Sequence, residues 1–515
     1  MLFDFLAQDA SWVFDLGAYS IVWNLVVQVG IVLIGLFLGN VLRNIIPFLK
    51  KSLIPSALIG GLLILIIKII LNALGVNSLE WTWNASWAAK AGVDPSVASI
   101  TFIDDNLLQV ITYHGLAIGF IASTFRTTKV KNKVNRVKVF ENGIMTGGTY
   151  MLQAAIGLFI TIVWFLITKG TEKEIFFSSG IILPLGYGQG PGNALTWDKN
   201  FSVLVFDANY VVANTGRSLF SGNGSFGLTI ASVGFVVASV IGVLHINIAR
   251  KRGIIKVRQG EQQVNVEDFV GENEIPDSES IDKFSVQLGL VALAYAISIL
   301  IMIVFAIISK FTNSIAWGFN FLWGVIAATL IKFLIKRLQK RKAIKRNYIN
   351  NHQMDRISGF AFDMMIVAGV GAIQIEFIER YIGVLFVLCA VGAVVSYFYV
   401  LFVCKHCFKG FEQEAFVTNF GTLTGTASNG MILLKEIDPG FVTPANNIFI
   451  LSQFPAIVTV APLLLILNFA SKSLTSAIIA AGIFFVLFIV YSMFLFRRKI
   501  FKKHYANKEE EIWQE

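Results

Sequence analysis

Cysteine is almost absent from this sequence: three of the 515 residues are cysteines, at positions Cys389, Cys404 and Cys407. So few cysteines exclude a fold that depends on a framework of disulfides. Charged residues are also scarce, at 14% of the chain, compared with about 25% in a typical soluble domain. Because hydrophobic residues make up 55%, too few polar side chains remain to cover a water-facing surface. The composition therefore excludes soluble, disordered and fibrous proteins and indicates a polytopic membrane protein.

Sequence motifs of common enzymes and cofactor sites are missing as well. The glycines of residues 186–192 complete neither a dinucleotide-binding pattern nor a Walker pattern. Cys404 and Cys407 have the spacing of a metal or redox pair, but no second pair of ligands accompanies them. No Ser/His/Asp array and no H-E-x-x-H motif is recognisable. We therefore expect neither an enzyme nor a bound cofactor.

Eleven segments are long and apolar enough to cross a membrane, which requires about 20 residues per helix. The N-terminal region carries acidic residues and no basic stretch before the first apolar run, so it is not expected to be a signal peptide. The eleven expected spans are roughly 20–42, 55–74, 103–124, 144–168, 226–249, 285–309, 315–336, 357–378, 382–404, 444–468 and 475–496.

Lysine and arginine indicate the orientation of these spans, because basic loops stay in the cytoplasm. If the N-terminus lies outside and the C-terminus inside, the inner loops and tail carry 31 of the 42 basic residues and the outer segments carry eight. The net charge of +10 then reflects anchors facing an anionic inner leaflet, and no nucleic-acid partner is expected. We expect a multi-pass protein of the cell inner (plasma) membrane. Lys68 and Lys332, which lie within spans, are expected to extend to a membrane surface.

Two further segments, 175–200 and 411–439, are partly apolar but broken by glycine. The first contains Pro191 among four alternate glycines, a combination that cannot continue a helix. According to the charge count, each segment must return to the side of the membrane from which it started. We therefore predict two re-entrant hairpins, the first entering from outside and the second from inside.

These elements predict an all-α polytopic membrane protein with an inverted-topology repeat of two five-helix units, each with a re-entrant hairpin, plus one extra C-terminal helix. Such repeats are common in secondary transporters. The expected parts are a first repeat at 1–249 with hairpin 175–200, a cytoplasmic linker at 250–284, a second repeat at 285–470 with hairpin 411–439, and an extra helix with a basic tail at 471–515.

The hairpin tips are the candidate binding site, because irregular backbone at membrane depth must be buried in protein or line a cavity. Half-helix N-termini there favour an anionic group, and half-helix C-termini favour Na⁺. Alternatively, the glycines and hydroxyls of the tips serve only close helix packing. The candidate substrate-binding residues are Gly188, Gln189, Gly190, Gly192, Asn193, Thr422, Thr424, Gly425, Thr426, Ser428 and Asn429.

Four residues are candidate Na⁺ ligands: Asp363, Gly369, Thr424 and Asn429. Asp363 is included because a carboxylate inside a span is commonly functional, although it could instead pair with a lysine or hydroxyl. His114, in the third span, is a further candidate as a proton relay or substrate ligand. A hydrogen-bonded core histidine is the alternative for that position.

Four stretches resemble the bacterial sodium–glutamate symporter family in their order and spacing. They are LRNIIPFLKKSLIPSALIGGLL (42–63), HGLAIGFIASTFR (114–126), GYGQGPGNALTWDKNF (186–201) and FGTLTGTASNGMILLKEI (420–437). The resemblance covers about residues 20–470. It implies a ten-helix inverted repeat, a homodimer, and a core around the hairpins that moves against a scaffold. Four features depart from the family. Gln189 stands among the glycines where the family tends to have a histidine, and the second hairpin is richer in threonine and asparagine and also lacks a histidine. A long segment, 200–225, follows the first hairpin, and an eleventh helix follows the repeat.

The sequence therefore predicts a secondary active transporter that brings glutamate into the cell by Na⁺ symport and alternating access. Its partners would be a small anionic amino acid, Na⁺ as coupling ion and the lipid bilayer. One alternative is a Na⁺- or H⁺-coupled carrier of another small carboxylate, such as citrate or malate. A non-transporting membrane receptor or scaffold is another alternative, and a membrane enzyme is the weakest.

Overall fold

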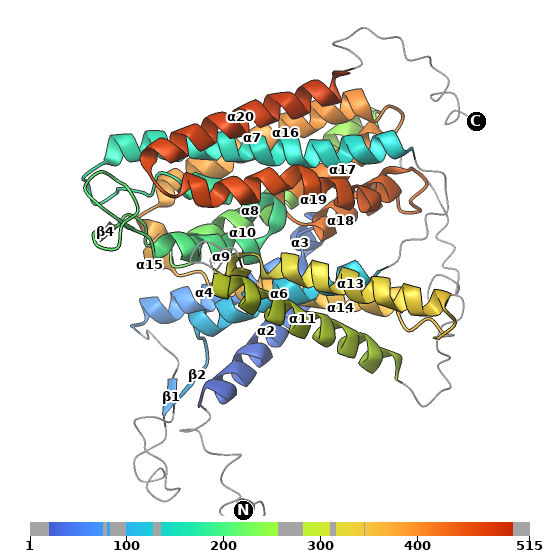
Figure 1. Ribbon diagram of the computed structural model, residues 1–515, viewed down its shortest axis with the longest axis horizontal. Helices are drawn as coiled ribbons and strands as arrows, with labels where there is room; N and C mark the ends of the chain where they lie inside the picture. The colour runs from blue at the N-terminus through green and yellow to red at the C-terminus, as the bar shows by residue number, and fades with distance from the viewer. Residues whose placement is uncertain are drawn as a thin grey trace, which may run out of the picture.

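The chain is a multi-pass membrane protein that consists mainly of helices (Figure 1). The computed structural model describes residues 20–75, 80–82, 99–126, 135–255, 282–308, 316–343 and 346–497. Eight of the described helices are long and apolar enough to cross a membrane, and the bent helix α19 makes a ninth. Most of the expected linker (256–281) and nearly all of the basic tail (498–515) lie outside the described residues.

All eleven expected spans are helices in the structure. They are α2 (Ser20–Ile45), α4 (Ser56–Ala73), α6 (Asp105–Phe125), α7 (Arg136–Thr168), α10 (Ser225–Lys251), α11 (Lys283–Ile308), α13 (Asn320–Lys340), α14 (Asn351–Gly371), α16 (Ile382–Cys407), α19 (Ala445–Ala470) and α20 (Leu474–Leu495). Short helices α3 (Pro47–Lys51) and α15 (Ile375–Glu379) lie in two of the connections.

The largest boundary errors have local causes. The segment expected at 357–378 begins earlier, at Asn351, because the side chain of Asn350 accepts a hydrogen bond from the backbone of Gln353 and caps the helix. Helix α7 begins eight residues before the expected 144 for the same reason, since the side chain of Asn135 caps it. Helix α19 contains two prolines and bends by 47°, as interior prolines require.

The two glycine-broken segments form helical hairpins. The first consists of the turn η2 (Ser179–Ile181), α8 (Ile182–Gln189) and α9 (Pro191–Ser202), and the second of α17 (Glu412–Thr424) and α18 (Ala427–Ile437). Phe176 and Phe201 bracket the first hairpin, and their ring centroids are 5.1 Å apart. An unbroken helix would separate these residues by about 37 Å at 1.5 Å per residue. The segment therefore folds back on itself, as predicted.

Two small sheets in the structure were not predicted from the sequence. Strands β1 (Glu80–Thr82) and β2 (Ser99–Thr101) form one antiparallel pair, and β3 (Val205–Phe206) and β4 (Arg217–Ser218) form the other. Two- and three-residue strands leave no periodic apolar pattern, so they cannot be read from the sequence.

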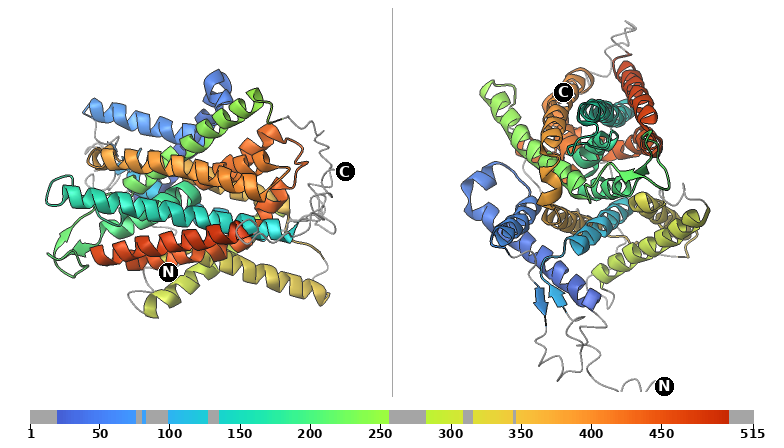
Figure 2. Two further views of the ribbon diagram at one scale, coloured as in Figure 1. Left: turned by 90° about the horizontal axis from the view of Figure 1, so that it is seen from above. Right: turned by 90° about the vertical axis from the view of Figure 1, so that its left-hand side faces the viewer.

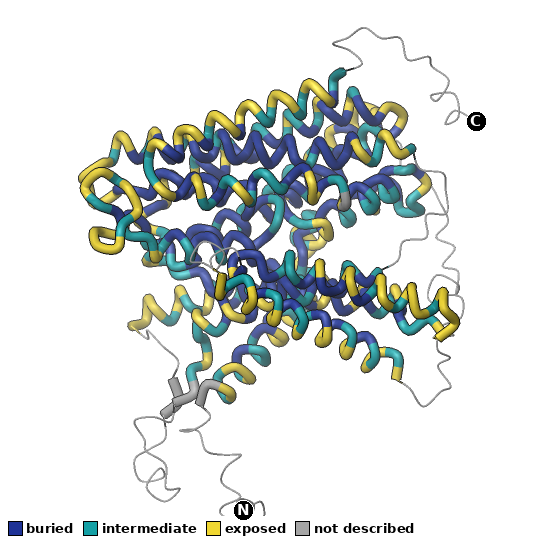
Figure 3. The backbone as a smooth tube through the Cα atoms, in the orientation of Figure 1, coloured by how far each residue is buried: buried dark blue, intermediate teal, exposed yellow. Residues whose placement is uncertain are grey.

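The helices divide into two groups (Figures 1 and 2). We call α7–α10 and α16–α20 the hairpin bundle, and α2, α4, α6, α11, α13 and α14 the lateral bundle. Seen along the helices, the α2/α4 and α11/α13 pairs lie on opposite sides of α6 and α14, which pack against each other (Figure 2, right). Buried residues follow the helix faces that meet inside each bundle, and exposed residues follow the outer faces (Figure 3). Leu195 of α9 and Leu228 of α10 pack into the core of the lateral bundle and join the two groups.

Candidate functional site

The two hairpin breaks meet at one place between the bundles. Gly190 separates α8 from α9 and has a φ of +84°, a conformation that glycine adopts without strain. A methyl group added to Gly190 would lie 3.7 Å from Cγ2 of Thr426, which begins the second half-helix of the other hairpin. The same methyl group would lie 3.7 Å from Cε of Met365 on α14. Residues from both hairpins and from the lateral bundle therefore surround the breaks.

The half-helices α9 and α18 both begin at this meeting point without a side-chain cap. The first N–H groups of a helix have no partner inside the helix, and together they carry about half a positive charge. Uncapped N-termini are therefore suited to an anionic group such as a carboxylate. The ends of α8 and α17 lie at the same breaks and offer backbone carbonyl groups, which suit a cation.

Two buried asparagines beside the breaks have an amide atom without a hydrogen-bond partner among the described residues. Asn193 is 1% exposed, and its Nδ2 donates to Oε1 of Gln189 at 2.7 Å, while its Oδ1 is unpaired. Asn429 is 2% exposed, and its Oδ1 accepts from Thr426 at 3.3 Å, while its Nδ2 is unpaired. An unpaired buried polar group costs about 1–3 kcal/mol. We therefore interpret the Asn193 oxygen as a ligand acceptor and the Asn429 amide as a ligand donor.

Other predicted tip residues have packing roles instead. The hydroxyls of Thr422 and Thr424 donate to backbone carbonyls one turn earlier in their own helix, at 2.8 and 2.7 Å. Gly188 lets the Tyr150 ring pack closely against α8, because a methyl group added there would lie 2.1 Å from the ring. Gly192 does the same for Leu116 and α9, because a methyl group there would lie 2.7 Å from Cβ of Leu116. For these four residues the contacts favour the packing interpretation. Ser428, by contrast, is exposed in the first turn of α18.

The proposed Na⁺ ligands are not assembled in one place. Gly369 faces the breaks, because a methyl group there would lie 3.0 Å from Cβ of Pro191. Asp363 is two residues from Met365 and therefore about 200° away around α14. It shares a face with Val367, which packs against Gly35 of α2. The sequence could not reveal this, because it gave no indication of which face of α14 the hairpins would meet.

The predicted histidine and the two lysines within spans have hydrogen-bond or ion-pair partners of their own. His114 is exposed on α6, where its Nδ1 hydrogen-bonds the hydroxyl of Tyr295 on α11, so it lies outside the tip site and outside the core. Lys68 does not extend to the surface but forms an ion pair with Asp105. Lys332 donates to the backbone oxygen of Thr124 at 2.8 Å, at the C-terminal end of α6.

The sequence reading passed over one carboxylate in the first hairpin. Asp198 is fully buried in α9, and its Oδ2 accepts from the backbone N–H of Gly227 at 2.8 Å, near the start of α10. This contact joins the second half of α9 to the first turn of the helix that follows it. An aspartate in a partly apolar segment is a signal that is visible in the sequence.

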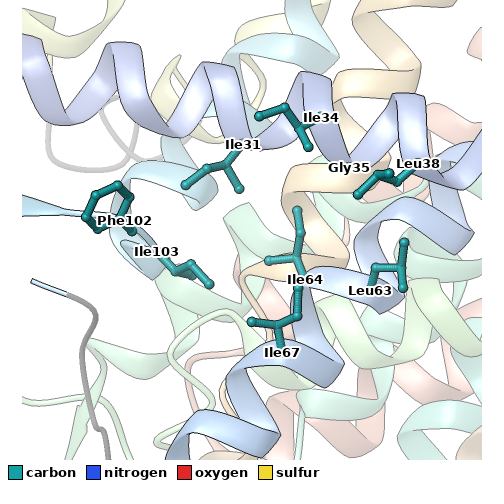
Figure 4. A pocket seen from close by; sticks show the side chains of 9 residues that line it. All are labelled: Ile31, Ile34, Gly35, Leu38, Leu63, Ile64, Ile67, Phe102 and Ile103. Carbon is teal, nitrogen blue, oxygen red and sulfur yellow. The ribbon is translucent and has the colours of Figure 1, made fainter.

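A groove of about 440 Å³ lies between α2 and α4 (Figure 4), and none of its lining residues belongs to a hairpin. Its lining is entirely apolar and includes Ile31 and Leu38 of α2 and Ile64 of α4. Ligand sites combine an apolar lining with a few polar groups that fix orientation. The groove has no such groups, so it is not the candidate site for an anionic solute.

Comparison with known protein families found no matching family model, and comparison with curated proteins found no match. What the residues at the breaks do must therefore be argued from their own chemistry.

Proposed function

We propose that the chain is a secondary active transporter that carries glutamate into the cell with Na⁺ by alternating access. One observation carries this proposal: two backbone breaks from different hairpins meet between two helix bundles and offer unpaired donors and acceptors there. Broken helices with this chemistry are typical of the substrate sites of secondary transporters. A receptor or scaffold has no need for interrupted backbone at membrane depth.

The pairing of helices supports an inverted repeat. In the first half α2 packs on α4, and in the second half α11 packs on α13. The second helix of each half packs on the third helix of the other half: α4 packs on α14, and α13 packs on α6. Each half places three helices in the lateral bundle and the rest in the hairpin bundle. We propose that the halves are inverted, with the N-terminus outside, the C-terminus in the cytoplasm, and α20 outside the repeat.

The chemistry of the tips supports an anionic amino acid as substrate. The N-termini of α9 and α18 and the Nδ2 of Asn429 would bind a carboxylate. The Oδ1 of Asn193 is an acceptor, which suits the ammonium group of an amino acid or a bound Na⁺. A citrate- or malate-like substrate offers this acceptor only a neutral hydroxyl, which forms a weaker hydrogen bond than a charged ammonium group. We therefore favour glutamate over another carboxylate as the transported anion.

The connectivity supports a relative movement of the bundles. The chain passes between the hairpin bundle and the lateral bundle at three connections, α6–α7, α10–α11 and α14–α16. The site lies where the bundles meet, so a displacement of one bundle would expose it to one side of the membrane and then the other. We propose the inner membrane of the cell as the location and a homodimer as the assembly.

Radiolabelled uptake into liposomes that contain the purified protein tests the substrate. We expect uptake of glutamate in Na⁺ but not in K⁺, with citrate and malate as poor competitors. Asn429→Ala should raise the half-saturating glutamate concentration about tenfold, the effect of about 1.4 kcal/mol of lost binding. Thr422→Val is the matched control, because its hydroxyl bonds to its own helix. Preferred uptake of citrate or malate would favour the alternative carrier, and no uptake of any anion would favour a receptor or scaffold.

A further inference from the structure

A third buried amide has an unpaired atom close to the second break. Gln153 lies on α7 and is 1% exposed. Its Nε2 donates to Oγ of Ser396 at 2.8 Å and to the backbone oxygen of Leu423 at 3.1 Å. Its Oε1 has no hydrogen-bond partner among the described residues. The side chain is therefore directed at the last turn of α17, with an oxygen that no described residue satisfies.

The end of α17 supplies negative potential at the same point. The helix ends at Thr424, so the carbonyls of its last turn, including that of Leu423, have no partner within the helix. The aligned peptide dipoles place about half a negative charge at this end. Gly234 of α10 allows the close approach, because a methyl group there would lie 2.4 Å from the backbone oxygen of Thr424.

A second buried amide side chain on α7 shows how such a group is satisfied by the protein alone. Asn142 lies three turns before Gln153 on α7 and donates to Ser452 at 2.7 Å, while its Oδ1 accepts from Asn419 at 2.8 Å. Both polar ends of that amide are satisfied within the protein. Gln153 differs in that its acceptor end is unsatisfied, so close packing of polar residues does not account for it.

We propose that Gln153, Ser396 and the carbonyl of Leu423 form a site for Na⁺. A rotation of the Gln153 amide group by about 180° would exchange the positions of Oε1 and Nε2. The oxygens of Gln153, Ser396 and Leu423 would then surround a single position. All three are neutral oxygens, which suit a monovalent ion, whereas Ca²⁺ sites use carboxylates. In the described part of the chain, no three His, Cys, Asp or Glu side chains are grouped to hold a metal. The inference rests on the proposed function, in which this Na⁺ is a coupling ion beside the substrate.

Thermal unfolding of the purified full-length protein in detergent, without glutamate, tests the site. A ligand that binds the folded state raises stability with its concentration. NaCl should therefore stabilise the protein more than KCl or choline chloride at equal ionic strength. Gln153→Leu should raise the Na⁺ concentration that gives half-maximal stabilisation by about tenfold or more. Gln153→Glu keeps the size of the side chain and adds a negative charge, so it should require less Na⁺ than the wild type.

Gln109→Leu is the matched control for these variants. Gln109 is also buried with an unpaired Oε1, but its Nε2 donates to the backbone oxygen of Asn223, at the start of α10. This variant should keep the wild-type Na⁺ response. An unchanged half-maximal Na⁺ concentration in both Gln153 variants would overturn the site, as would equal stabilisation by Na⁺ and K⁺ in the wild type.

The test separates this inference from the proposed function, because it contains no glutamate. A Gln153-dependent response to Na⁺ in a protein that transports no glutamate supports the site and contradicts the function. Na⁺-driven glutamate uptake together with a wild-type Na⁺ response in Gln153→Leu and Gln153→Glu contradicts the site and leaves the function standing.

Discussion

Gly190→Ala is expected to abolish Na⁺-driven glutamate uptake while leaving a folded, membrane-inserted protein. Gly190 has a φ of +84°, which costs an alanine about 1–3 kcal/mol. The added methyl group meets no atom closer than 3.7 Å, so the strain is local and the fold survives. Relief of the strain would turn the start of α9 and redirect the N–H groups that face the substrate. The measurement is initial uptake in proteoliposomes, with insertion checked by detergent extraction and gel filtration.

Gly425→Ala should have a similar effect through a different contact. A methyl group at Gly425 would lie 2.6 Å from Nδ2 of Asn429 and 2.9 Å from Cβ of Ala238, so the Asn429 side chain must move. Gly482→Ala on α20 is the matched control, because no atom lies within 4 Å of the added methyl group. It should transport normally. Normal uptake by both hairpin variants, with inactivity of Asp363→Asn or His114→Ala, would place the site elsewhere.

Lys68→Met is expected to produce the largest loss of stability among the changes outside the hairpins. Lys68 forms an ion pair with Asp105 and donates to the backbone oxygens of Gly371 and Ile373, each at 3.0 Å, where α14 ends. The lysine therefore ties α4 and α6 to the end of α14. Its removal leaves a carboxylate and two carbonyls without a charged donor in a largely apolar environment.

Loss of one partner of a buried ion pair costs about 3–5 kcal/mol. The two side chains here are 18% and 20% exposed, so we expect about 2–3 kcal/mol, below that range because water reaches the remaining charge. The melting temperature in detergent should fall by several degrees. Lys68→Met combined with Asp105→Asn should recover most of the loss, because no unpaired charge remains. An unchanged melting temperature in the single variant would mean that Lys68 extends to the surface after all.

The elements that follow from composition were predictable, and the contacts between distant residues were not. Long apolar runs predicted the eleven helices, of which eight, or nine with the bent α19, are long and apolar enough to cross a membrane, and the glycine-rich segments predicted the breaks at Gly190 and Gly425. The position of Asp363, on a different face of α14 from Met365, was not foreseen because helical periodicity fixes which residues share a face, but not which neighbour that face meets. The Lys68–Asp105 pair was missed because the charge count treats each lysine as an independent anchor. Gln153 was missed because a single neutral amide in a span has no motif.

Na⁺-dependent glutamate accumulation under a set membrane potential tests the central claim most directly. One Na⁺ with one glutamate anion is electroneutral, and a tenfold Na⁺ gradient then supplies about 1.4 kcal/mol. Two Na⁺ supply about 2.8 kcal/mol. Two Na⁺ with one glutamate anion also carry one net positive charge, and its inward movement adds about 2.3 kcal/mol per 100 mV of membrane potential. We predict that proteoliposomes accumulate glutamate only with an inward Na⁺ gradient, and more strongly when the interior is made negative. Accumulation that ignores the potential would contradict coupling to two or more Na⁺, and equal uptake in K⁺ would contradict Na⁺ symport itself.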